Sequence, residues 1–246
     1  MLSFSHLNLK SRLTDVCGHA DAGQFVHVMG TNGSGKSSLL HTLAGLLQPD
    51  SGEVYLKQRN IKEFSLPQLA SFRCLQEQQH TSMFALTVAE LLYFFSGQRD
   101  LPEQLEQALE LKTFLHRPIS RLSGGEAGRV HIARALLQVW PAINQGQAII
   151  LLDEPNQGLD FKHQHLLFRL LAAICDQQNL VIVNHHDLNL CQQYAHKIWL
   201  MQEGRIAHAL YSLNDISHGQ LAQVFGCAIE CAINHRGNKI FQTYLE

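Results

Sequence analysis

The chain has 246 residues, which is long enough for one large α/β domain with a small insertion. Hydrophobic residues make up 46% of the chain, as is typical of a globular protein, and no apolar run approaches the ~18 residues that a membrane-spanning helix needs. The formal net charge of -2 gives no support to a nucleic-acid partner.

The N-terminal residues, Met1 to His6, contain no basic region followed by an apolar core, so we expect no secretion signal. The six cysteines are scattered and form no C-x-x-C pair, which predicts reduced thiols in a cytoplasmic protein. The fifteen histidines include the pairs His163/His165 and His185/His186, but no H-E-x-x-H motif or Cys/His cluster accompanies them. We therefore expect solvated or packed histidines, with one exception given below.

Short apolar runs bounded by turn residues alternate with helical patterns, which predicts a mostly parallel sheet. Residues 25–29 predict a buried strand, and residues 36–47 predict the helix that follows it. A Pro-Asp-Ser-Gly turn then leads into a strand over 53–56. Two later apolar runs, 148–152 and 180–183, predict central strands.

Helical spacing dominates the middle of the chain, where no comparable strand pattern occurs. We therefore predict a single domain over 1–246, with a core formed by about 1–78 and 145–246 and a helical subdomain over about 79–144. The segment 231–245 alternates like a hairpin. The expected fold class is α/β, with a mostly parallel central sheet, an antiparallel β portion and an inserted α-helical subdomain.

The segment GTNGSGKS, residues 30–37, fits the P-loop pattern G-x-x-x-x-G-K-[ST] and stands between the predicted strand and helix. Its glycines allow backbone N–H groups to surround a β-phosphate, and the helix N-terminus adds the positive end of its dipole. Lys36 would bring charge to the β- and γ-phosphates, and Ser37 would bring a hydroxyl to Mg²⁺. The alternative, a glycine-rich turn without a ligand, explains this full match less well. The residues expected to bind ATP here are Gly30, Thr31, Asn32, Gly33, Ser34, Gly35, Lys36, Ser37 and Ser38.

Two adjacent carboxylates, Asp153 and Glu154, follow the apolar run 148–152. The carboxyl end of that strand should place Asp153 beside the P-loop. Because adjacent residues at a strand end point in different directions, Asp153 can hold Mg²⁺ while Glu154 faces the attacking water. A buried pair of acids without a function would be costly, so we interpret the pair as catalytic.

The segment Leu122-Ser123-Gly124-Gly125-Glu126 distinguishes between classes of P-loop protein. Ser123 stands at the N-cap position of a predicted helix and Glu126 at its capping-box position. Two glycines in a first helical turn weaken a helix by about 1 kcal/mol each. They also leave backbone N–H groups exposed and give a phosphate room to approach.

Together these motifs resemble the ABC ATPase family over essentially the whole chain. The resemblance implies a homodimer packed head to tail, in which the 122–126 segment contacts the ATP held by the other copy. It also implies that the 156–160 loop contacts the partner copy, that His186 (the exception among the histidines) contacts the γ-phosphate, and that Gln78 senses Mg²⁺ and water. His185 has no role in the family. The implied site residues are therefore Glu154, His186 and Gln78 for catalysis, Ser37, Gln78 and Asp153 for Mg²⁺, and Ser123, Gly124, Gly125 and Glu126 for ATP.

The chain departs from the family pattern at three places. We call the 122–126 segment the signature, and the helix that begins after Ser123 the signature helix. Gly128 stands where the family usually has glutamine, which predicts a weaker signature helix at the same location. No aromatic residue lies where the family stacks one on adenine, and Arg12 is near enough to stack there by its guanidinium plane. The 139–147 segment makes the spacing from the signature to Asp153 longer than usual.

The chain resembles the ATPases of bacterial vitamin B12 importers in this longer spacing, in a short N-terminal region and in the glutamine-rich segment 76–79. The ATPases of haem and iron-siderophore importers are the alternatives. The resemblance implies ATP and Mg²⁺ as cofactors and a position on the cytoplasmic face of the bacterial inner membrane as a peripheral protein. The implied partners are a second ATPase copy, integral membrane permease subunits and a periplasmic substrate-binding protein.

Two other classes fit the sequence less well. ABC-type ATPases of DNA repair or chromosome structure carry long coiled coils or basic faces, and the sequence has neither sustained heptads nor basic runs, so we expect no nucleic-acid partner. A nucleotide kinase would lack the 122–126 segment and His186. For docking to a membrane subunit the apolar stretch 83–88 is the candidate; we expect Phe84 to dock, whereas Leu91 and Leu92 pack inside.

Overall fold

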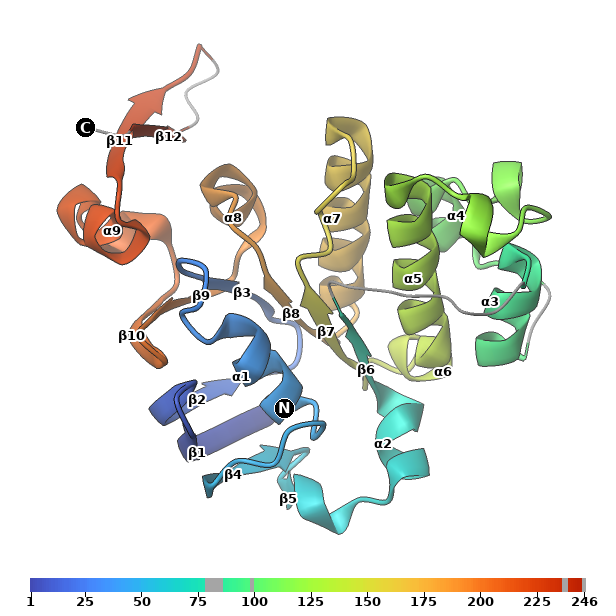
Figure 1. Ribbon diagram of the computed structural model, residues 1–246, viewed down its shortest axis with the longest axis horizontal. Helices are drawn as coiled ribbons and strands as arrows, with labels where there is room; N and C mark the ends of the chain where they lie inside the picture. The colour runs from blue at the N-terminus through green and yellow to red at the C-terminus, as the bar shows by residue number, and fades with distance from the viewer. Residues whose placement is uncertain (78–85, 98–99, 236–238, 245–246) are drawn as a thin grey trace.

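The computed structural model describes residues 1–77, 86–97, 100–235 and 239–244, and its ribbon is drawn in Figure 1. A six-stranded sheet of order β10-β9-β3-β8-β7-β6 forms its centre. Strands β9, β3, β8, β7 and β6 are parallel, and β10 pairs antiparallel with β9 at one edge. The strands are β3 (Phe25–Met29), β6 (Arg73–Gln76), β7 (Ile149–Asp153), β8 (Leu180–Asn184), β9 (Lys197–Gln202) and β10 (Arg205–Leu210).

A second, antiparallel sheet has the order β2-β1-β4-β5. The side chain of Phe4 joins it to the central sheet, since its ring meets that of Trp199 edge-on at 5.3 Å between centroids. Near the C-terminus a hairpin of two strands forms a separate small sheet, at the upper left of Figure 1. The strands of these two sheets are β1 (Leu2–Leu9), β2 (Leu13–Ala20), β4 (Ser51–Leu56), β5 (Arg59–Asn60), β11 (Ala228–Ile233) and β12 (Lys239–Tyr244).

Helices α3 to α6 follow one another between β6 and β7, where the helical subdomain is predicted, and α3, α4 and α5 lie together at the right of Figure 1. The boundaries of that subdomain stay a prediction. The α-helices are α1 (Lys36–Leu43), α2 (Leu66–Phe72), α3 (Val88–Ser96), α4 (Glu103–Leu109), α5 (Gly124–Gln138), α6 (Trp140–Ile143), α7 (Phe161–Asp176), α8 (Leu188–Tyr194) and α9 (His218–Phe225). Short 3₁₀ turns are η1 (Ile61–Glu63), η2 (Lys112–Phe114), η3 (Ile119–Arg121) and η4 (Leu213–Asp215).

The predicted α/β class, with a mostly parallel sheet and an antiparallel portion, is confirmed. All residues of β3, β7 and β8 are buried, as continuous apolar runs in a parallel sheet require. The helix predicted over 36–47 ends at Leu43, because Gly45 adopts a left-handed φ of 74° and stops it. The short strand β6 was not predicted, since its Arg-Cys-Leu-Gln sequence carries no clear apolar pattern.

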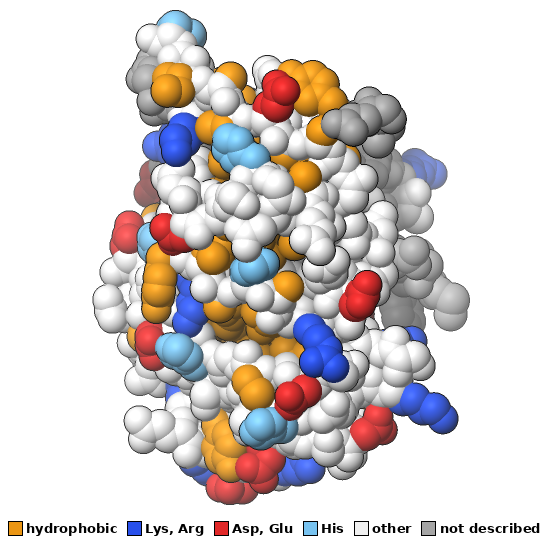
Figure 2. All heavy atoms as spheres, turned by 90° about the vertical axis from the view of Figure 1, so that its left-hand side faces the viewer, with side chains coloured by type: hydrophobic (Ala, Val, Ile, Leu, Met, Phe, Trp, Pro, Cys, Tyr) orange, Lys and Arg blue, Asp and Glu red, His pale blue; other side chains and the backbone are white. Residues whose placement is uncertain are grey.

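Surface features agree with the low net charge. The face that carries the C-terminal hairpin mixes acidic, basic, histidine and hydrophobic side chains, with the basic ones separated from one another (Figure 2). Within the described residues, no helix is both long enough and apolar enough to cross a membrane. All six cysteines are free thiols.

Replacing Gly128 by alanine should stabilise the fold. Gly128 lies inside α5, and a Cβ added there would meet only Cδ2 of Leu159, at 3.9 Å. Alanine in a helix interior is favoured over glycine by about 1 kcal/mol, which corresponds to a rise in Tm of roughly 2–4 °C for a protein of this size. Differential scanning calorimetry measures this shift.

Gly125→Ala is the matched control, because its Cβ would lie 2.7 Å from the carbonyl oxygen of Gly158. This variant should gain no stability. An unchanged or lower Tm for Gly128→Ala would show that the signature helix needs glycine at this position.

Candidate active site

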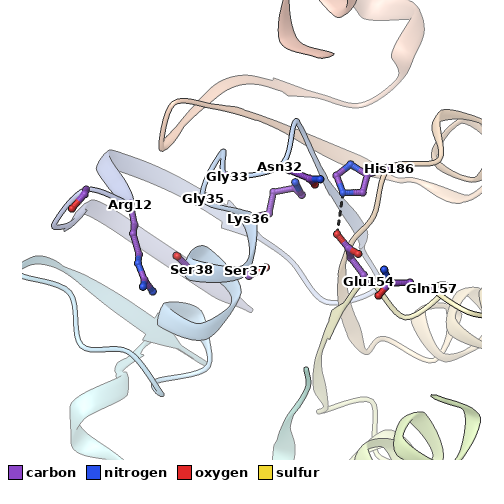
Figure 3. Close-up of a pocket in the computed structure, with 11 residues that line it drawn as sticks. Arg12, Asn32, Gly33, Gly35, Lys36, Ser37, Ser38, Glu154, Gln157 and His186 are labelled. Atoms are coloured by element: carbon purple, nitrogen blue, oxygen red, sulfur yellow. Dashed lines mark hydrogen bonds and ion pairs between the residues drawn. The ribbon is translucent and has the colours of Figure 1, made fainter. Parts of the chain in front are cut away.

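The P-loop joins the end of β3 to the start of α1 and lines a cavity of about 580 Å³ (Figure 3). Gly30 has a φ of 147°, and a Cβ there would lie 2.2 Å from the carbonyl oxygen of Met201, so only glycine fits. Gly35 caps α1 with a φ of 101°. The backbone thus turns sharply and presents the N-terminus of α1 to the cavity. Its lining residues are Ser11, Arg12, Asn32, Gly33, Gly35, Lys36, Ser37, Ser38, Glu154, Gln157 and His186.

The ammonium group of Lys36 is held inside the loop. Its Nζ donates hydrogen bonds to the carbonyl oxygens of Gly30, at 2.9 Å, and of Thr31, at 2.8 Å. Burial lowers the pKa of Lys36, while the charges of Glu154 and Asp153 act in the opposite direction. This places a buried positive charge between the P-loop and the two acids, where a phosphate group would find a charged partner.

Ser37 of α1 and Asp153 of β7 form a hydrogen bond that joins these two elements. The Ser37 hydroxyl, in the first turn of α1, donates to Oδ1 of Asp153 at 3.1 Å. Asp153 is the last residue of β7 and is buried. A hydroxyl and a carboxylate are hard oxygen ligands that suit Mg²⁺, so both residues fit the predicted metal site. The third predicted ligand, Gln78, lies outside the described residues.

Glu154 and His186 face each other at one end of the cavity. The distance from His186 Nε2 to Glu154 Oε1 is 2.9 Å, and the two side chains are 40% and 17% exposed respectively. Glu154 adopts a left-handed φ of 49°, a conformation that costs a non-glycine residue of order 1–3 kcal/mol. Arg12 lines the cavity on the other side of the P-loop (Figure 3). Glu154, an acid that can polarise water, thus lines the same cavity as Lys36.

The signature residues lie at the N-terminus of α5. The Ser123 hydroxyl accepts from the backbone N–H of Glu126 at 3.3 Å, and the Ser123 N–H donates to the Glu126 carboxylate at 2.8 Å, so the predicted capping box is formed. This backbone hydrogen bond, aided by Arg117, lowers the pKa of Glu126. None of the predicted residues 123–126 lines the P-loop cavity of the same chain. Gly124 instead lines a second cavity of about 300 Å³, together with Glu154 and Gly158.

Sequence reasoning missed Asn184, the last residue of β8. Its side chain is 1% exposed and bridges the acid pair, accepting from the Glu154 N–H at 2.6 Å and donating to Asp153 Oδ1 at 2.5 Å. A polar residue that ends an otherwise apolar strand is a signal that could have found it. Gln157, which also lines the cavity, carried no such signal.

His185 is buried in the core, as expected for a histidine without a family role. Its Nε2 lies 2.7 Å from Nδ1 of His27, and its Nδ1 accepts from the N–H of Asp187 at 3.1 Å. His185 therefore carries its proton on Nε2 and donates it to His27. Burial lowers the pKa of His185 to about 3 and holds that of His27 well below its usual value.

Comparison with known proteins connects this geometry to a family. Residues 13–157 match the family described as ABC transporter. A vitamin B12 import ATP-binding protein, BtuD, of Photorhabdus laumondii is 31% identical over 250 residues, which cover 100% of this chain and 98% of that protein. The BtuD protein of Yersinia pseudotuberculosis is 35% identical over 213 residues, which cover 84% of each.

Solved structures show the same fold. A dimeric ATP-binding cassette in a post-hydrolysis state, bound to ADP and Pi, matches with a TM-score of 0.72 and 25% identity, covering 86% of this chain and 98% of that one. An ATP-binding subunit of an ABC transporter matches with a TM-score of 0.76 and 21% identity, covering 91% of this chain and 94% of that one.

Acid should destabilise the protein through the buried histidine pair. Below about pH 6.5, the unfolded chain takes up protons at His27 and His185 that the folded chain does not bind. The free energy of unfolding should therefore fall by about 1.2 kcal/mol for each histidine as the pH falls from 6 to 5. Urea unfolding at each pH measures this slope.

His185→Asn removes one of the two groups and should reduce this contribution by roughly half. The exposed His218 gives the control, since His218→Asn should leave the slope unchanged. A wild-type stability that stays constant from pH 7 to pH 5 would contradict the buried, neutral pair.

Lys36→Ala should weaken nucleotide binding. The variant loses a charged hydrogen-bond donor worth about 1.5–3 kcal/mol, which predicts a Kd for MgATP roughly 10- to 100-fold higher. Isothermal titration calorimetry measures it, with the exposed Lys112→Ala as a control for lost charge alone. Unchanged affinity in Lys36→Ala would remove the P-loop assignment.

Proposed function

Because this chain belongs to the ABC transporter family, we propose that it is the ATP-hydrolysing subunit that powers a membrane importer, with vitamin B12 as its cargo. The resemblance drawn from its motifs is confirmed, and the chain is an ABC-type ATPase. One observation carries the proposed site: the P-loop lysine, Ser37, the two acids and His186 meet at the edge of one sheet. Binding of ATP follows from the family, and the use of Mg²⁺ is part of the proposal.

Hydrolysis is assigned to Glu154. When bound, Mg²⁺ would be held by Ser37 and Asp153 and would neutralise charge on the β- and γ-phosphates. Lys36 would bind the same phosphates from inside the loop. Glu154 would accept the proton of the attacking water, and His186, 2.9 Å from that carboxylate, would orient it and contact the γ-phosphate. Gln78 belongs to this set by resemblance alone.

We infer that two copies act together. The signature residues Ser123 to Glu126 stand away from the P-loop cavity of their own chain, which is what a role at the other copy's ATP requires. The related cassette bound to ADP and Pi is dimeric, which supports the same arrangement here. The loop over 156–160 would form part of the contact between the copies.

The assignment of vitamin B12 rests on relatives rather than on chemistry in this chain. Curated relatives at 31–35% identity are named as vitamin B12 import proteins. We propose from them that permease subunits and a periplasmic substrate-binding protein complete the system, and that the chain binds peripherally at the cytoplasmic face of the inner membrane. Importers of haem or iron siderophores are the second candidates. Phe84, predicted to dock against the permease, lies outside the described residues.

Glu154→Gln should separate binding from hydrolysis. Glutamine keeps the size of the side chain and its hydrogen bonding but cannot accept the proton, so the hydrolysis rate should fall by ~10²–10⁴-fold while ATP still binds. Uncleaved ATP should then hold two copies together. Size-exclusion chromatography with MgATP, beside a phosphate-release assay, measures both effects.

Asp153→Asn is the contrasting variant. The loss of a metal ligand should weaken the binding of MgATP itself, so this variant should form no stable dimer. If Glu154→Gln hydrolysed ATP at the parental rate, another residue would be the base.

A further inference from the structure

Asn184 occupies the point where the acid pair and the histidine segment meet. It is the last residue of β8, paired in register with Asp153 at the end of β7. Two residues later comes His186, whose ring contacts the Glu154 carboxylate. Asn184 is thus next to both residues whose side chains face the cavity, while its own side chain is buried and 1% exposed.

The oxygen and the nitrogen of the Asn184 side-chain amide both form hydrogen bonds within the protein. Its Oδ1 accepts the Glu154 backbone N–H at 2.6 Å, and its own backbone carbonyl lies 3.2 Å from the same N–H. Its Nδ2 donates to Oδ1 of Asp153 at 2.5 Å. Because only an amide offers an acceptor and a donor in this fixed geometry, the acceptor fixes the backbone of one acid and the donor fixes the carboxylate of the other.

Glu154 needs such a restraint. Its φ of 49° lies in the left-handed region, which a non-glycine residue adopts only at an energetic cost that surrounding contacts must offset. The Glu154 N–H is the group nearest to that strained bond, and Asn184 binds it from the protein interior.

Asn184 also reaches the metal site. Oδ1 of Asp153 accepts two hydrogen bonds, one from Asn184 and one from the hydroxyl of Ser37. A continuous series of hydrogen bonds therefore runs from α1 through Asp153 and Asn184 to the backbone of Glu154. The backbone of Glu154 and the carboxylate of Asp153 are held in register by one side chain from a third element.

We propose that Asn184 is a positioning residue for ATP hydrolysis, acting through Glu154 by holding its backbone in the left-handed conformation and tying it to Asp153. The inference rests on the proposed function, in which Glu154 is the base. Asn184 contacts no substrate in this role, so its loss should change kcat and leave nucleotide binding nearly intact.

The experiment compares Asn184→Ala with wild type in the full-length chain, measuring MgATP hydrolysis and the Kd for MgATP. A base that is misplaced by about 1 Å loses roughly 10²-fold in rate, so kcat should fall by about 10- to 100-fold with KM and Kd within about 3-fold of wild type. Single-turnover hydrolysis is then repeated in the Glu154→Gln background. There the added Asn184→Ala change should cost less than about 3-fold, because both changes act on one base.

Asn179 provides a matched control. It is also a fully buried asparagine with a bridging amide, which accepts from the N–H of Ala148 and donates to the carbonyls of Ile143 and Ile174, away from the cavity. Asn179→Ala should lower stability by at least as much as Asn184→Ala without the selective loss of kcat. If both variants lose activity only in proportion to unfolded protein, Asn184 is structural and the proposal is wrong.

Asn184→Asp gives a second readout if the alanine variant does not fold. Aspartate retains the acceptor for the Glu154 N–H, but as a carboxylate it cannot donate to Asp153. We therefore expect Asn184→Asp to lower kcat while KM stays within about 3-fold of wild type. Wild-type kcat in a folded Asn184→Asp variant would overturn the role of the donor.

The outcomes separate the two proposals. Loss of hydrolysis in Glu154→Gln with full kcat in Asn184→Ala overturns the positioning role alone. Parental hydrolysis in Glu154→Gln overturns the assigned base, and the inference about Asn184 falls with it.

Discussion

Three apolar strands, β3, β8 and β7, pair in parallel, so that their carboxyl ends meet at one edge of the sheet. This alignment brings the P-loop, the acid pair and His186 together. The P-loop leaves β3, the acid pair ends β7, and Asn184 with His186 follows β8. Residues separated by more than a hundred positions in the chain thereby come within hydrogen-bond distance, as Ser37 and Asp153 do.

The alignment also concentrates charge that the protein must compensate internally. Lys36, Asp153 and the partly buried Glu154 lie close together, and a buried charge is costly unless other groups pair with it or form hydrogen bonds to it. The carbonyls of Gly30 and Thr31 satisfy the ammonium, while Ser37 and Asn184 satisfy Asp153. The site is therefore charged and preorganised by its own hydrogen bonds, which is the condition under which electrostatic stabilisation of a phosphoryl group is most effective.

Local patterns predicted those parts of the fold and site that are contiguous in sequence. The P-loop, the strand ending at Asp153 and the cap at Ser123 each depend on a few neighbouring residues, and the structure forms the capping box as predicted. Features that depend on tertiary pairing were missed. Strand β6 is defined by its pairing with β7 rather than by its own sequence, and Asn184 acquires its contacts only when β8 lies beside β7.

The loop between the acid pair and α7 joins the two halves of the proposed mechanism within one chain. It starts at Glu154, turns through a hydrogen bond from the Gln157 N–H to the Glu154 carbonyl, and reaches Gly158, whose carbonyl oxygen packs against Gly125. Any Cβ at Gly125 would collide with that carbonyl, so the first turn of the signature helix packs directly on this loop. In the proposed dimer, a phosphate of the other copy's ATP would contact a helix whose first turn packs on the backbone that leads to the acid of the same chain. The close approach at Gly125 would thus join the signature of one site to the acid of the other.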